Sequence, residues 1–266
     1  MNWLLCWATP LNFLACPATI PDSLIAASAG YVAVFPDYLN MKSLGKASTH
    51  VLPYLLLEPT ALASLDAVRA AQTYLTQNES VSATNDVYVW GHSQGAQAVQ
   101  YTMAMQPFYA PEYTFKAAAS ISPPTDLAAS AQANFVGPAP NYNLGDGVAY
   151  AWSDYYDAAQ LTNALRSPWD TMALGQLQNY CNSNYTDPIK NVTDPNTVFT
   201  STFMDIFTRG GKFDPWSCWL YYNSPSTMTL PMPKNVPMLY VTGDKDTTVI
   251  PAANDPVVAK WCAQGV

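Results

Sequence analysis

Short apolar runs alternate with amphipathic stretches through much of this chain. Runs of strand length occur at Trp3–Trp7, Tyr31–Phe35, Val87–Trp90, Phe115–Ser120 and Val236–Val241. Helices are expected at Pro21–Ala29, which Gly30 ends, and at Thr60–Thr76, where apolar residues recur at helical spacing. Strands that alternate with helices form a mainly parallel sheet covered on both faces. The pattern therefore predicts an α/β fold.

This alternation disappears between Pro123 and Pro233, where Asn, Tyr, Trp, Pro and Asp are frequent. Two helices are expected there, at Tyr155–Leu165 and Thr171–Tyr180. An insertion between consecutive strands lies over the carboxyl edge of the sheet, where such folds bind ligands. We therefore predict a core of residues 1–125 and 234–266 with an inserted cap of residues 126–233. A separate small domain is the alternative.

A candidate nucleophile lies in the segment Gly91-His92-Ser93-Gln94-Gly95, between the strand-like run that ends at Trp90 and a helix-like run that starts at Ala96. A serine at such a junction adopts unfavourable backbone angles to present its hydroxyl, and glycines two residues before and after it relieve the crowding. The alternative is a glycine-rich turn that matches by chance. The flanking strand and helix favour Ser93 as a catalytic nucleophile.

A nucleophilic serine needs a base, a carboxylate that orients the base, and donors for the developing oxyanion. Asp246 follows the last expected strand in a G-x-x-D turn, and we expect it to be the acid in preference to Asp244, because the fourth position points back over the sheet edge. Ordinary turn formation is the alternative use of both aspartates. The backbone N–H of Gln94 is the expected first oxyanion donor. Thr9 is the expected second, since Pro10 has no N–H.

The base is harder to place, because His50 and His92 are the only histidines and both precede Asp246. In α/β enzymes with a nucleophilic serine at such a turn, the histidine follows the acid along the chain. Neighbouring residues on a sharp turn point in different directions, so we expect His92 to be structural. His50 follows the second strand on the carboxyl side of the sheet, so it and Tyr38 are candidates to line the pocket. His50 as the base is the alternative.

Composition narrows the possible partners. Charged residues are 11% of the chain and the net charge is −8, which argues against nucleic acid or an anionic membrane surface as a partner. No stretch has the length and uniform apolarity of a membrane-spanning helix. The five cysteines lack metal-ligand spacing, so neither a metal nor another cofactor is expected. Cys181 and Cys218 are expected to pair, because a long irregular segment gains most from a cross-link.

Six segments carry a resemblance to a known family: Gly30–Tyr38, His50 with Pro53–Leu55, Leu65–Ala71, the Gly91–Gly95 turn, Asn223–Pro225 and Trp261–Gly265. Together they resemble the secretory lipase family of α/β-hydrolases, which includes fungal lipase A enzymes and related bacterial esterases. The resemblance implies an α/β-hydrolase fold in which Ser93 is the nucleophile and Asp246 the acid. It also implies carboxylic-ester or lipid substrates of fatty or shorter acyl chains, and a secreted or extracytoplasmic location.

Two departures from the family leave alternatives open. Members of the family carry more sequence before the first strand, and also after the Trp-Cys segment, where their catalytic histidine lies. We therefore expect this chain to be cut at both ends. The leading hypothesis is an ester hydrolase with an acyl-Ser93 intermediate. The alternatives are an inactive binding protein, or fragment, that keeps the fold, and a serine peptidase of the same fold.

Overall fold

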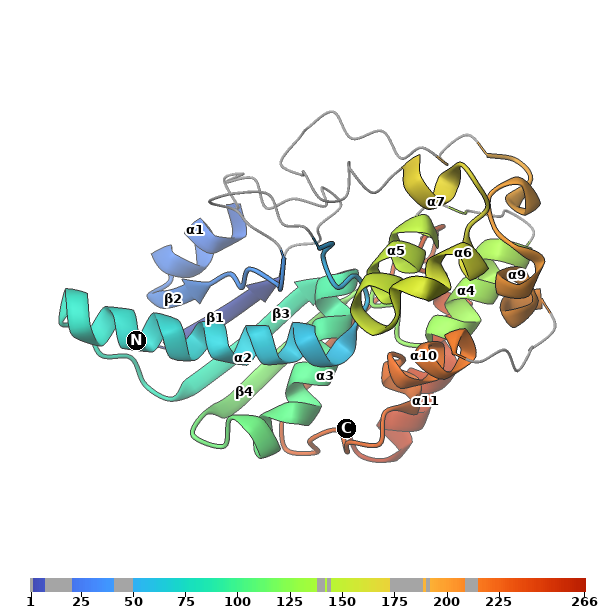
Figure 1. Ribbon diagram of the computed structural model, residues 1–266. Helices are drawn as coiled ribbons and strands as arrows, with labels where there is room; N and C mark the ends of the chain where they lie inside the picture. Colours follow the sequence, from blue (N-terminus) through green and yellow to red (C-terminus); the bar gives the residue numbers. More distant parts are fainter. Residues whose placement is uncertain are drawn as a thin grey trace.

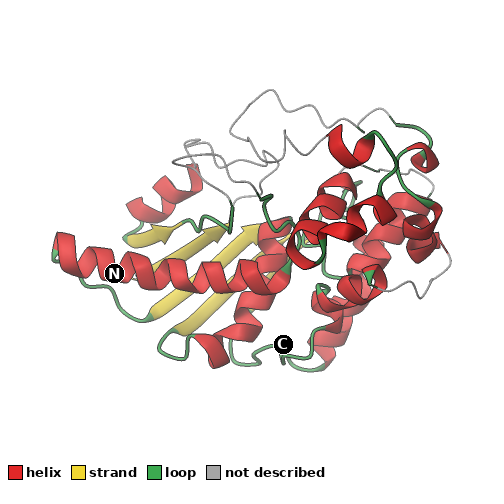
Figure 2. Cartoon of the chain, in the orientation of Figure 1, coloured by secondary structure: helices red, strands yellow, loops and turns green. Residues whose placement is uncertain are grey.

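The protein is built on a parallel sheet. The computed structural model describes residues 2–7, 21–40, 50–137, 142, 145–172, 189, 192–208 and 215–266. Within them the five parallel strands have the order β2-β1-β3-β4-β5. Figure 2 shows the sheet in yellow with helices in front of it. The strands are β1 (Asn2–Trp7), β2 (Tyr31–Val34), β3 (Asp86–His92), β4 (Thr114–Ile121) and β5 (Met238–Val241).

Strand β3 lies at the centre of this sheet. Val89 pairs with Leu5 on one side and with Ala118 on the other. Val87 and Val89 are buried, and they alternate with half-buried residues along the strand. The order of strands reverses at β1, which lies between β2 and β3, so the carboxyl ends of β1 and β3 border the crevice where folds of this type bind ligands.

Within the described ranges, four helices accompany the strands: α1 (Pro21–Ser28), α2 (Leu57–Tyr74), α3 (Gln94–Tyr109) and α11 (Pro251–Ala263). Helices α2 and α3 pack against each other on one face of the sheet, and α2 runs across the foreground of Figure 1. Helix α3 is buried from Gln94 to Ala104. From β1 the chain crosses to β2 at one edge of the sheet, whereas its later crossovers lead toward β5 at the other edge. Because such crossovers are right-handed, α1 lies on the face of the sheet opposite to α2 and α3.

A helical segment separates β4 from β5 in sequence and lies beyond the carboxyl ends of the strands (Figure 1). Its helices are α4 (Leu127–Val136), α5 (Gly145–Tyr156), α6 (Leu161–Ala164), α7 (Trp169–Met172), α9 (Ser201–Thr208) and α10 (Trp216–Tyr222). Single turns occur at η2 (Ala158–Gln160), η3 (Pro195–Thr197) and η4 (Pro225–Thr227), and a π-helical turn, η1 (Leu75–Glu79), extends α2.

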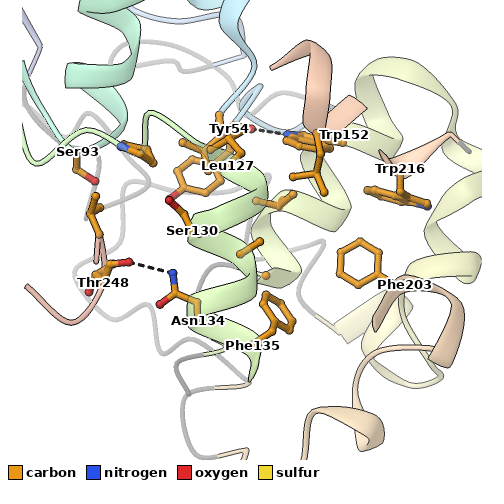
Figure 3. A pocket seen from close by; sticks show the side chains of 17 residues that line it. Tyr54, Ser93, Leu127, Ser130, Asn134, Phe135, Trp152, Phe203, Trp216 and Thr248 are labelled. Atoms are coloured by element: carbon orange, nitrogen blue, oxygen red, sulfur yellow. Dashed lines mark hydrogen bonds between the residues drawn. The ribbon is translucent and has the colours of Figure 1, made fainter. Parts of the chain in front are cut away.

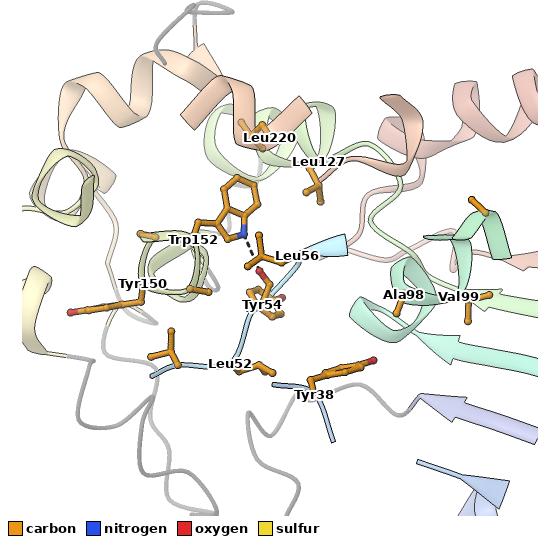
Figure 4. Close-up of a cluster of buried hydrophobic side chains, with 14 of the residues drawn as sticks. Tyr38, Leu52, Tyr54, Leu56, Ala98, Val99, Leu127, Tyr150, Trp152 and Leu220 are labelled. Carbon is orange, nitrogen blue, oxygen red and sulfur yellow. Dashed lines mark hydrogen bonds between the residues drawn. The ribbon is translucent and has the colours of Figure 1, made fainter. Parts of the chain in front are cut away.

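The helical segment and the sheet share one hydrophobic core. Trp152 of α5 stacks on Trp216 of α10 with ring centroids 6.3 Å apart, and Phe203 of α9 meets Trp216 edge to face at 5.0 Å. These rings belong to the same buried cluster as Val87 and Val89. Figure 4 shows the connection, because Tyr38, Leu52, Tyr54 and Leu56 lie between Trp152 and the α3 residues Ala98 and Val99. The scattered aromatic residues of the segment thus extend the core of the sheet.

The expected strands are all present, with ends that differ by at most two residues. The expected helix at Tyr155–Leu165 is wrong: α5 ends at Tyr156 and α6 begins at Leu161. The interruption has a local cause, because Asp157 accepts the N–H of Ala159 at 3.0 Å and caps a separate turn. The second expected helix, Thr171–Tyr180, overlaps α7, and its residues 173–180 lie outside the described part of the chain.

The expected disulfide is also wrong. Cys218 is a free cysteine on the exposed side of α10, and Cys181 lies outside the described residues. None of the described helices has the length and apolarity to span a membrane.

Candidate active site

Ser93 occupies a strained turn between β3 and α3. Its backbone angles are φ 54° and ψ −120°, a region that costs a residue other than glycine about 1–3 kcal/mol. Hydrogen bonds hold the turn on both sides, since the Ser93 N–H donates to the Ile121 carbonyl at 2.9 Å. The Ser93 carbonyl accepts the N–H groups of Ala96 and Gln97 at 2.9 and 3.1 Å. Such strain persists only where the surroundings enforce it, which makes Ser93 a candidate functional residue.

Gly91 allows this turn to close. A Cβ atom at Gly91 would lie 2.4 Å from both the carbonyl carbon and the carbonyl oxygen of Gly95. Those atoms belong to the backbone of the first turn of α3, so they cannot move aside as a flexible side chain would. Glycine at position 91 is therefore required by the close approach of strand and helix.

Ser93 opens onto a cavity of about 110 Å³ (Figure 3). Part of the wall comes from turns and loops at the carboxyl edge of the sheet: Tyr54, Leu55, Ser93, Pro124, Thr248 and Val249. Burial raises the pKa of Tyr54, and the nearby Asp146 carboxylate raises it further, so the Tyr54 phenol stays neutral at physiological pH.

The rest of the wall comes from the helical segment between β4 and β5. Helix α4 contributes Leu127, Ser130, Ala131, Asn134 and Phe135. Helices α5, α9 and α10 contribute Gly145, Val148, Trp152, Phe203, Trp216 and Leu220. The Trp152 indole N–H donates to the Tyr54 carbonyl at 2.9 Å, which ties this wall to the loop before α2. The cavity is therefore mostly apolar, with Ser93 at one side.

Asp246 lies in the turn that follows β5. Its Oδ1 accepts the N–H groups of Thr248 and Val249, each at 2.9 Å, and its own N–H donates to the Gly243 carbonyl at 3.1 Å. Thr248 and Val249 line the cavity, so the Asp246 carboxylate shapes the turn that forms this wall. Asp244, in the same turn, is exposed. The structure thus gives the two aspartates different surroundings.

Gln94 is the first residue of α3, directly after Ser93. Its backbone N–H is one of the first-turn donors that have no acceptor within a helix, as an oxyanion donor requires. The side chain is only 1% exposed, and neither its amide nitrogen nor its amide oxygen has a hydrogen-bond partner in the described structure. Thr9, the expected second donor, lies outside the described residues.

His50 and Tyr38 were expected to line the pocket, and neither is among the described residues that line this cavity. His50 Nδ1 lies 3.0 Å from Asp154 Oδ1 of α5, and the His50 side chain is 62% exposed. Tyr38 is buried in the core instead, and burial raises its pKa. His92 is the half-buried last residue of β3 and is also absent from the described wall.

Sequence reasoning missed α4, the helix that supplies one whole wall. Asp126 caps it by accepting the N–H of Ala129 at 2.9 Å. Asn254 of α11 accepts the N–H groups of Thr125 and Asp126, at 2.8 and 3.0 Å, and fixes where the helix begins. The cap residue and the helical spacing of Leu127, Ala131 and Phe135 were the signals that could have revealed it.

The Asn223-Ser224-Pro225 segment joins the elements around the cavity. The Asn223 amide oxygen accepts the Leu57 N–H at 3.1 Å, and the Gln97 amide donates to the Asn223 carbonyl at 3.0 Å. Ser224 Oγ accepts the N–H of Leu127 at 3.0 Å. Buried polar groups thus connect α2, α3 and α4 to the end of α10.

Comparisons with known proteins agree with this architecture. A family model described as secretory lipase matches residues 18–266. No curated protein matches the sequence. Among solved structures, the rice cell wall degrading esterase LipA from Xanthomonas oryzae is similar with a TM-score of 0.75 and 22% identity, over 99% of this chain and 72% of that one. Candida antarctica lipase A is similar with a TM-score of 0.64 and 18% identity, over 91% of this chain and 52% of that one. Identities this low establish the fold, which is that of lipase and esterase hydrolases.

Proposed function

Because this chain belongs to the secretory lipase family, we propose that it hydrolyses carboxylic esters through a covalent acyl-Ser93 intermediate. One observation carries the proposal: Ser93 has φ 54° in the Gly91–Gly95 turn and lies at the wall of a mostly apolar cavity. That combination is typical of a nucleophile elbow beside an acyl site.

In the proposed reaction, Ser93 Oγ attacks the ester carbonyl carbon and loses its proton to a base. The carbonyl oxygen becomes an oxyanion that accepts the Gln94 N–H, with Thr9 as the proposed second donor. The tetrahedral intermediate then expels the alcohol, which takes up the proton. Water releases the acid from Ser93 by the same steps, and Asp246 is the proposed carboxylate that orients the base.

Neither histidine of the sequence is proposed as this base. His50 pairs with Asp154 at the surface, and His92 is not among the described residues of the cavity wall. Without an imidazole beside it, a serine hydroxyl keeps only the acceleration that binding and oxyanion donors provide, about 10³- to 10⁴-fold over water in other enzymes. We therefore expect slow turnover of activated esters by these 266 residues alone.

The proposed substrates are esters of fatty or shorter acids whose acyl chain enters the cavity. Residues 126–233 are the proposed cap over this site, and each methylene group buried beneath it contributes about 0.8 kcal/mol. Activity should therefore rise with acyl length until the cavity is full. The family is described as secretory, and a secreted or extracytoplasmic location is part of the proposal.

A binding protein of the same fold is the second candidate, and the absence of a histidine from the described cavity wall favours it.

Labelling by a fluorophosphonate and hydrolysis of p-nitrophenyl esters from acetate to decanoate separate the two functions. Labelling and hydrolysis that disappear in Ser93→Ala support the hydrolase, whereas their absence from the unmodified chain supports the binding protein. A preference for peptide over ester substrates would indicate a peptidase. Loss of activity in His50→Ala would identify His50 as the base.

A further inference from the structure

In the part of the chain that the structure describes, two buried oxygen atoms of α4 beside the cavity lack hydrogen-bond partners. Ser130 and Asn134 both line the cavity, and neither Ser130 Oγ nor Asn134 Oδ1 has a partner in the described structure. The Asn134 amide nitrogen donates to the Thr248 carbonyl at 3.0 Å, which fixes the oxygen as the free end of this amide. Ser130 is only 6% exposed.

Native proteins keep few such atoms, because a buried polar group without a partner loses its hydrogen bonds to water and gains none. Asn134 Oδ1 can only accept a hydrogen bond, whereas Ser130 Oγ can donate or accept. A molecule that fills the cavity and satisfies both atoms must therefore carry a donor. A ketone or ether oxygen cannot supply it, but a hydroxyl group can.

The spacing of the two residues fits a single hydroxyl group. Ser130 and Asn134 are four residues apart on one helix, so their Cβ atoms are about 5–6 Å apart. Two O–H···O bonds of about 2.7–2.8 Å that meet at one hydroxyl oxygen at a near-tetrahedral angle join side-chain oxygens about 4.5 Å apart, a separation that side chains on neighbouring turns can reach. One ligand oxygen placed between the two side chains can accept from Ser130 and donate to Asn134.

We propose that the cavity selects acyl chains that carry one hydroxyl group, which binds between Ser130 and Asn134. This rests on the proposed function, since it places the acyl chain of an ester in the cavity. Figure 3 shows both residues on the side of Ser93 and Thr248, away from the rings of Trp152, Phe203 and Trp216. The hydroxyl therefore belongs in the half of the chain nearer the ester group, and the aromatic wall receives the apolar end.

Equilibrium binding to a Ser93→Ala variant tests this without turnover. The ligands are ethyl octanoate and its monohydroxy isomers, and the signal is the fluorescence of the tryptophans that line the cavity. One isomer with its hydroxyl in the carbonyl-side half should bind about tenfold more tightly than ethyl octanoate, as two net hydrogen bonds allow. Adding Ser130→Ala or Asn134→Leu should reduce this preference to less than about twofold.

Ser153→Ala is the matched control. Ser153 of α5 is also a buried serine whose Oγ has no partner among the described residues, and it is not part of the described cavity wall. That variant should keep the preference. Equal binding of all isomers, or a preference that survives both α4 substitutions, would overturn the proposal. Binding does not depend on catalysis, so a retained preference with no fluorophosphonate labelling of the unmodified chain would refute only the esterase function.

Discussion

At the scale of single residues, the two aspartates after β5 give a direct test of the proposed acid. Asp246→Asn keeps an oxygen that can accept the Thr248 and Val249 N–H groups, so the turn should survive while the charge is lost. If a base acts on Ser93 and Asp246 orients it, Asp246→Asn should lower the rate of ester hydrolysis by orders of magnitude, about 10⁴-fold in a comparable triad, whereas turnover that proceeds without a base should not change. Asp244→Asn is the exposed control and should change the rate less than about twofold. A larger effect at Asp244 would reverse the assignment.

Tyr38 offers a second test, because its buried hydroxyl has no hydrogen-bond partner in the described structure. Tyr38→Phe should leave the free energy of unfolding within about 1 kcal/mol at pH 7, since removal of an unpaired hydroxyl exposes no new polar group.

The same substitution should make the free energy of unfolding less dependent on pH in the alkaline range. Burial raises the pKa of Tyr38 in the folded state, so above about pH 10 the unfolded chain releases this proton and the folded chain keeps it. Stability is then lost as pH rises, by up to about 1.4 kcal/mol per pH unit for each such tyrosine. Urea unfolding between pH 9 and 11.5 measures the slope. Equal slopes in Tyr38→Phe and the unmodified chain would contradict the assignment.

Single residues were predictable from the sequence where local chemistry fixes them. The strained turn at Ser93 follows from two glycines between a strand and a helix, which are adjacent in the chain. The surroundings of Tyr38 and His50 could not be predicted because they come from distant residues, in the case of His50 from Asp154 on α5. No local pattern indicates that a histidine will pair at the surface with a residue 104 positions later.

At the scale of elements, the hydrogen bonds of Asn223 should stabilise the arrangement of helices around the cavity. Asn223→Ala leaves the buried N–H of Leu57 without its acceptor and leaves a cavity in its place. We expect a loss of about 3 kcal/mol in the free energy of unfolding. Asn196→Ala, at an exposed asparagine in η3, should cost less than about 0.5 kcal/mol. Urea unfolding measures both, and equal losses would contradict a special role for Asn223.

Strands were easier to predict than the helices around the cavity. A buried strand is a short, nearly continuous apolar run, and each expected run lies in the sheet. Helix α10 packs Trp216 on Trp152 of α5, and α9 packs Phe203 on Trp216, so these helices of seven and eight residues depend on one another's rings. Only the tertiary packing of Trp152, Phe203 and Trp216 makes these short helices stable.

At the scale of the whole molecule, the fold class followed from the order of the elements. Strands and helices that alternate lead to a parallel sheet with helices on both faces, and the strand order reverses at β1. The shape and lining of the cavity could not be predicted in this way. Its wall combines the loop at Tyr54, helix α4 and the turn at Thr248, which meet only when the sheet has formed.

The exposed edge of this sheet leads to a prediction about association. In the described structure β5 is an edge strand, and Leu239 and Val241, two residues apart and so on one face, are 62% and 39% exposed. Strands of parallel sheets are normally covered on both faces, and an unpaired apolar edge is a template for another chain. We therefore expect the 266-residue chain to self-associate at micromolar concentration. Leu239→Lys should shift it toward monomer, because a charge opposes edge pairing.

Sedimentation velocity across a concentration series measures this shift. Ile25→Lys is the matched control, because Ile25 of α1 is similarly exposed at 65% and lies near the opposite edge strand, β2. If apolar exposure anywhere on the surface caused association, both lysine variants would be more monomeric. A change confined to Leu239→Lys locates the contact at β5, and a monomeric unmodified chain at all concentrations would refute the prediction.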